Sequence, residues 1–87
     1  MTTRDRERAA RLLAECPYID RIERITDERG RRPRLALSVS VSWRSARGWE
    51  EDPRDRVIYD LDDARALITE LTARSSSALA ATGVATA

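Results

Sequence analysis

The sequence predicts a small α+β domain in which two helices pack on one face of a three-stranded antiparallel sheet. Three observations lead to this prediction: a helical apolar stripe near the N-terminus, a strictly alternating segment in the middle, and an Asp-capped amphipathic segment after it. The 87 residues suffice for one domain only. We expect a single domain over residues 1–74 and a flexible, low-complexity Ser/Ala/Thr tail over residues 75–87.

The first helix is expected over residues 3–16. Its apolar stripe follows the spacing i, i+3, i+4, i+7 and consists of Ala9, Leu12, Leu13 and Cys16. Thr2 and Asp5 fit a capping box at its start, and Pro17 disfavours helical geometry at the residue before it.

Residues 18–29 fit two structures. Tyr18, Ile22 and Ile25 suit a helix that ends at Gly30, whereas the sequence Asp27–Glu28–Arg29–Gly30 matches a hairpin turn closed by a left-handed glycine. The turn favours a strand with one bulge, which also explains the broken alternation.

The clearest strand runs from Leu35 to Trp43. Leu35, Leu37, Val39, Val41 and Trp43 share one face, and small residues that include three serines share the other. Residues 44–56 read as a long charged loop, and Val57–Tyr59 as a short strand. The helices should cover the face of Leu35 to Trp43 and leave the serine face outside.

The second helix should begin after Asp60, which is a suitable N-cap. Asp62 and Asp63 lie in its first turn, where negative charge interacts favourably with the helix dipole. The core stripe consists of Ala64, Leu67, Ile68 and Leu71. Oppositely charged residues at i, i+4 predict ion pairs on both helices: Glu7 with Arg11, Arg11 with Glu15, and Glu70 with Arg74.

The composition excludes several classes of chemistry. Without His or Lys the chain has no imidazole base, no His metal ligand, no Schiff-base amine and no phosphate-loop lysine. The single Cys16 forms no internal disulfide and reads as a small core residue. We therefore expect no enzyme activity, no catalytic residue, no cofactor, no metal and no small-molecule substrate.

Two acidic groups are the only candidates for a divalent cation, namely Glu50–Asp52 and Asp60–Asp63. Neither has the spacing of a calcium loop, and the second is already explained as a helix cap. We interpret both as structural.

The run from Arg29 to Arg34 is the only local basic patch. It holds Arg29, Arg31, Arg32 and Arg34 at the expected hairpin tip, where guanidinium groups can reach phosphates. All 16 basic residues are Arg and the net charge is +1, so a solvated turn in an Arg-biased chain is the simpler explanation of the patch. Nucleic-acid binding through this tip is the alternative function.

A protein interface is the first hypothesis. Trp49 lies in the charged loop with no expected burial and suits either a partner contact or a position folded back onto the core, whereas Trp43 falls on the core face. Ser38, Ser40 and Ser42 form a flat polar stripe that would let a second copy approach. Because a chain of this size has a thin core, self-association or a protein partner would stabilise it.

The strand at Val57–Tyr59 and the Asp-capped helix after it, with the segment Ala64–Arg65–Ala66–Leu67, resemble small proteins of high-GC actinobacteria and their phages. The resemblance covers residues 35–74 and concerns proteins mostly of unknown function. It implies an accessory or structural role in a phage or mobile element and transfers no site residue. With neither a signal peptide nor a membrane span in the sequence, we expect a cytoplasmic or, for a phage protein, virion-associated location.

Overall fold

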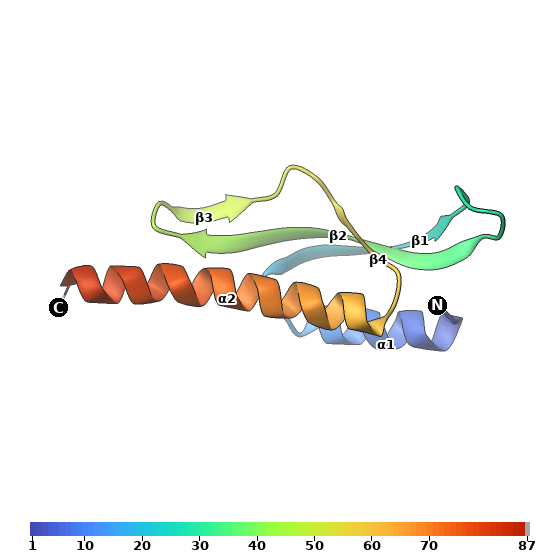
Figure 1. Ribbon diagram of the computed structural model, residues 1–87, viewed down its shortest axis with the longest axis horizontal. Coiled ribbons are helices and arrows are strands. Elements are labelled where there is room, and N and C mark those ends of the chain that lie inside the picture. The colour runs from blue at the N-terminus through green and yellow to red at the C-terminus, as the bar shows by residue number, and fades with distance from the viewer. Residues whose placement is uncertain (87) are drawn as a thin grey trace.

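A computed structural model describes residues 1–86, with side chains through Ser77. The chain forms one helix, four strands and a second helix (Figure 1). Their bounds are α1 Thr3–Ala14, β1 Ile19–Asp27, β2 Arg34–Ser45, β3 Gly48–Glu51, β4 Arg56–Ile58 and α2 Leu61–Thr86. The predicted α+β class, with an antiparallel sheet between two helices in sequence, is confirmed.

Strand β2 is the centre of the sheet because every other strand pairs with it, each antiparallel. β1 pairs along its length from Val41 to Arg34, with a bulge between Ile19 and Arg21. This settles the ambiguity over residues 18–29 in favour of a bulged strand.

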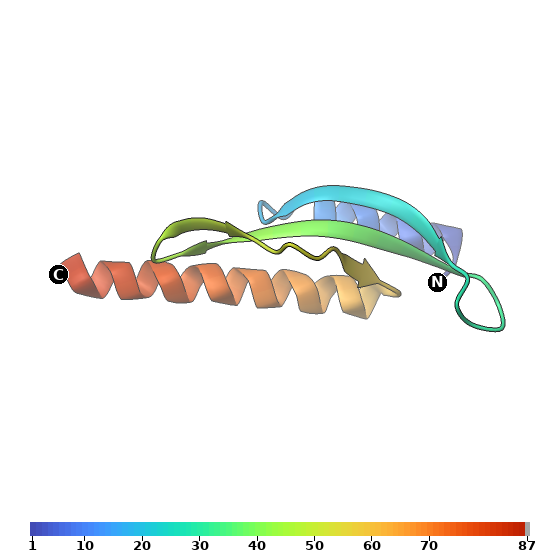
Figure 2. The ribbon, with the colours of Figure 1, turned by 90° about the horizontal axis from the view of Figure 1, so that it is seen from above.

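The two helices lie side by side on one face of the sheet, so the molecule has two layers (Figures 1 and 2). α1 lies behind β1, and α2 runs beneath β2 and β4. The core between the layers includes Leu13, Leu37, Val39, Val41 and Leu71, all at most 1% exposed. The face predicted to be buried is therefore the one that the helices cover, and the face of the serines carries no helix.

α1 begins as predicted, since the amide of Asp5 donates to Thr2 Oγ1 over 3.1 Å. It ends at Ala14, two residues before the expected end, because the backbone turns ahead of Pro17. The predicted ion pairs within the helices are wrong. Glu7 instead binds Arg24 of β1, and Glu70 binds Arg56 of β4 over 2.6 Å.

The loop over residues 44–56 contains a strand that the sequence pattern did not predict. β2 continues to Ser45 and turns directly into β3, whose four residues are all exposed. Gly48 supplies the positive φ of this turn, +112°. The expected left-handed Gly30 is wrong, because Gly48 has the only positive φ among the glycines that the structure describes.

α2 is capped as predicted, with the amide of Asp63 donating to Asp60 Oδ1 over 2.7 Å. The helix passes the expected boundary at residue 75. Ser75 is fully buried and accepts a 3.1 Å hydrogen bond from the amide of Arg44, so it packs with the domain. The side chains of residues 78–87, most of the predicted tail, lie outside the described residues.

The protein is elongated, with principal extents of 54, 22 and 17 Å and a radius of gyration of 15.0 Å. A compact chain of this length has a radius of gyration of about 12 Å. The accessible surface of 6201 Å² likewise exceeds the ~5,200 Å² expected for a monomer of this mass. Across the described chain, neither helix combines the length and the apolar character that crossing a bilayer requires.

Candidate interaction surface

We call the sheet face opposite the helices the open face. An aromatic pair lies on it near the C-terminal end of β2. Trp49 of β3 is 57% exposed, and its ring centroid lies 5.9 Å from that of Tyr18. The guanidinium of Arg44, the β2 residue paired with Trp49, lies 6.0 Å from the same ring. An exposed Trp that is flanked by a second ring and a guanidinium has the composition of a protein-interface anchor.

The serines on the open face are hydrogen-bonded to carboxylates of neighbouring segments. Ser38 and Ser40 donate hydrogen bonds to the carboxylate of Asp55, at 3.4 and 3.1 Å. Ser42 is only 6% exposed and donates to Asp20 over 3.1 Å. The segment between β3 and β4, which carries Asp55, rises above the sheet here (Figure 1). The serines therefore hold this segment in place, and the chemistry at the surface is that of the carboxylates.

An acidic hollow of about 380 Å³ lies beside these carboxylates. Its charged lining comprises four carboxylates and one guanidinium, from Asp20, Glu51, Asp52, Asp55 and Arg21. Only a long contact of 3.9 Å links Arg21 to Asp55. The hollow therefore carries net negative charge and favours a cationic partner group.

The tip between β1 and β2, residues 28–33, lies at the other end of β2 (Figure 1). Asp27 accepts hydrogen bonds from the amide and side chain of Arg29 and, over 2.7 Å, from the Tyr59 hydroxyl. These bonds, that of the Arg29 side chain foremost, hold the pKa of Asp27 well below its ordinary value of 3.8. The guanidinium of Arg34 stacks 4.4 Å above the Tyr59 ring.

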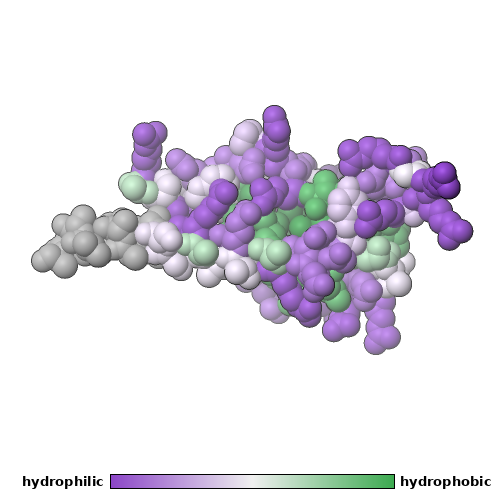
Figure 3. All heavy atoms as spheres, viewed as in Figure 1, coloured by the Kyte–Doolittle hydropathy of each residue, from purple (hydrophilic) through white to green (hydrophobic). Residues whose placement is uncertain are grey.

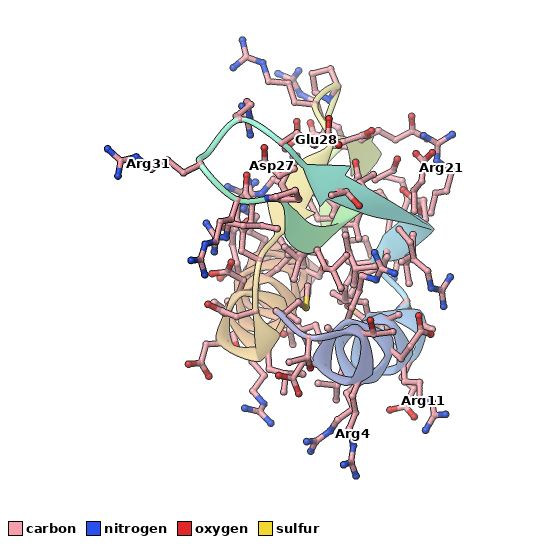
Figure 4. The ribbon with its side chains drawn as sticks, turned by 90° about the vertical axis from the view of Figure 1, so that its right-hand side faces the viewer. Arg4, Arg11, Arg21, Asp27, Glu28 and Arg31 are labelled. Atoms are coloured by element: carbon pink, nitrogen blue, oxygen red, sulfur yellow. The ribbon has the colours of Figure 1, made fainter. Side chains whose placement is uncertain are left out.

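The four arginines of the predicted patch therefore divide into two pairs. Arg29 and Arg34 serve internal contacts at the base of the tip. Arg31 and Arg32 are exposed and join no ion pair within the described part of the chain. Figure 4 shows Arg31 pointing away from the molecule, and hydrophilic side chains project at this end in Figure 3.

The two acidic groups considered for a cation have structural contacts. Glu50 accepts a 3.2 Å hydrogen bond from the Trp43 indole, and Asp63 accepts one of 3.0 Å from the amide of Tyr59. Among the described side chains, no three His, Cys, Asp or Glu groups are placed to share a metal ion. Cys16 is 8% exposed and packs as the small core residue that the sequence predicts.

Sequence reasoning missed Tyr18, Asp20 and Asp55 as parts of this surface. Tyr18 gave only an apolar signal, and its pairing with Trp49 joins residues 31 positions apart. Asp55 lies in a segment whose path over the sheet no local pattern encodes.

Comparisons of the chain with protein-family models, with curated proteins and with solved structures find no match. The assignment of a function therefore depends on the geometry and chemistry of the open face.

Proposed function

We propose that this protein is a non-catalytic assembly module that associates with a second copy of itself through the open face. The exposure of Trp49 carries the proposal, because a Trp that is 57% exposed beside Tyr18 leaves an aromatic surface open to a partner. A Trp that becomes buried in an interface is typical of a binding hot spot.

Charge complementarity supports a second copy as the occupant. A cationic tip lies at one end of β2, with Arg31 projecting beyond the edge of the sheet (Figure 4), and the acidic hollow lies on the open face toward the other end. In a two-fold arrangement that sets one tip against the partner's hollow, the second tip faces the other hollow in the same way, so the opposite charges pair twice. The net charge of +1 gives little repulsion against this pairing.

The size of the molecule also supports association. Its accessible surface is about a fifth larger than a monomer of this mass requires. We expect the assembly to form in the cytoplasm, or in a virion if the chain serves a phage, as its resemblance implies.

Light scattering coupled to size-exclusion chromatography tests the proposal. We expect a mass of twice 9.8 kDa for the wild type at micromolar to millimolar concentration. Trp49→Ala should weaken the dimer about tenfold or more without unfolding the domain. Arg47→Ala, an exposed change in the same hairpin, is the control and should leave the mass unchanged.

A wild type that stays monomeric over this range would refute self-association. A dimer that tolerates Trp49→Ala would remove the open face from the interface.

A further inference from the structure

The outer face of α1 carries three arginines in a row. Arg4, Arg8 and Arg11 follow at i, i+4 and i+7, so they lie on one side of the helix, and all three are exposed. We call them the α1 arginine stripe. Figure 4 shows Arg4 and Arg11 projecting from the helix away from the sheet. At about 1.5 Å of rise per residue, the stripe extends about 10 Å along the helix axis.

Glu7, one turn before Arg11 on the same helix, forms its ion pair with a strand and not with the stripe. Glu7 binds Arg24 of β1 through two hydrogen bonds of 2.5 and 2.6 Å. The hydrogen bond to Arg24 is the main cause of the lowered pKa of Glu7, and it directs the carboxylate toward β1. Among the described residues, the stripe takes part in no ion pair.

A hollow of about 240 Å³ beside the stripe adds a further cation. It lies between the two helices and is lined by Arg8, Arg11, Leu12, Glu15, Leu61 and Arg65. Its carboxylate is Glu15, and Arg65 is paired with Asp62 at 3.6 Å. The hollow and its ion pair thus hold three guanidinium groups and two carboxylates. This part of the helical layer therefore carries a net positive charge.

We infer that the α1 arginine stripe binds the phosphate backbone of a nucleic acid. A row of cations about 10 Å long suits a linear polyanion, whose phosphates repeat along the strand, better than a single small anion. Arginine is also suited to phosphate because its planar fork donates two parallel hydrogen bonds.

A bilayer fits this face less well. Membrane binding by a surface helix needs large apolar side chains beside the basic ones. The large exposed hydrophobic residues of the described chain are Trp49 and Val57, which belong to β3 and β4 in the sheet layer. Pairing of two open faces would leave the helical layers outward, so the stripe stays accessible in the proposed dimer as well.

Fluorescence anisotropy with a labelled 20-base-pair duplex of arbitrary sequence tests the inference. Binding should be measurable at low salt and should weaken steeply as salt rises. The double variant Arg8→Glu/Arg11→Glu should reduce affinity at least tenfold. Arg8→Ala/Arg11→Ala, which keeps good helix formers in place, should lower the slope of log K against log salt by about 2.

The matched control is Arg47→Glu/Arg54→Glu, two exposed arginines outside the stripe and the tip, because it changes the net charge by the same amount as the stripe variant. It should retain duplex binding. Equal losses in both variants, or a loss confined to the control variant, would overturn the inference. So would a wild type that does not bind the duplex at low salt, or one that binds phosphatidylserine vesicles and not the duplex.

Discussion

The hydroxyl of Tyr59, just after β4, donates a 2.7 Å hydrogen bond to Asp27 at the end of β1. The two residues come from opposite edges of the sheet, so their bond spans β2 between them. Arg29 donates to both, which fixes the base of the tip.

Acid should weaken this cluster. The folded-state pKa of Asp27 lies below the ordinary value of 3.8, so its stabilising effect is complete above that pH and is lost as the pH falls below it. We expect Asp27→Asn to be less stable than the wild type at pH 7, with a smaller difference at pH 3. Urea unfolding at both pH values measures this. An equal difference at both would show that the charge of Asp27 contributes nothing.

Replacement of Ser75 by Ala should destabilise the domain. The change removes the acceptor for the amide of Arg44, and loss of a partly buried hydrogen bond costs about 1 kcal/mol. Ser76→Ala is the matched control, because Ser76 is exposed on the same helix and undergoes the same change in helix propensity. Thermal unfolding should give a midpoint for Ser75→Ala about 4–8 °C lower per kcal/mol lost. Equal midpoints for the two variants would contradict the hydrogen bond.

Two glycines should respond differently to alanine. Gly48 has φ +112°, which an L residue adopts only with strain of about 1–3 kcal/mol, although nothing lies within 4 Å of a Cβ there. Gly30 has no positive φ, and a Cβ would meet only the Arg32 carbonyl at 3.9 Å. Urea unfolding should therefore show a loss for Gly48→Ala and no loss, or a gain, for Gly30→Ala. The reverse order would show that the turn before β3 does not require a positive φ at Gly48.

Charge reversal should identify the contact in the proposed dimer. Arg31→Glu should weaken the dimer by placing a carboxylate against the acidic hollow, and Glu51→Arg should weaken it by reversing a charge of that hollow. The chain with both changes should recover part of the lost affinity, because each copy then offers a reversed pair. Sedimentation equilibrium of the four proteins measures the coupling. Strictly additive losses would place the tip and the hollow in separate parts of the interface.

The sequence predicted those elements whose burial follows a period. Val39 and Val41 alternate with serines and lie in the core, and Asp60 caps the second helix as its position indicates. β3 escaped prediction because it is held by pairing to β2 while all four of its residues stay exposed, so no hydrophobic period marks it.

The predicted ion pairs failed for a related reason. The spacing i, i+4 predicts ion pairs only between residues of the same helix. In the structure, Glu7 and Glu70 each form an ion pair with an arginine of a strand that packs against the helix. The same tertiary choice leaves Arg11 unpaired by Glu7, which sequence spacing could not show. For the candidate surface, Trp49 was predicted as the exposed aromatic, but its neighbour Tyr18 required the fold.

Because β1, β3 and β4 each pair with β2 and with no other strand, the sheet has no part that can persist without it. A chain cut within residues 28–33 would separate α1 and β1 from the rest, and each fragment would expose the apolar surface that the other covers. The two fragments are thus natural halves of a split protein. If each fragment were fused to half of a reporter protein, the reporter signal would measure the pairing of β1 with β2.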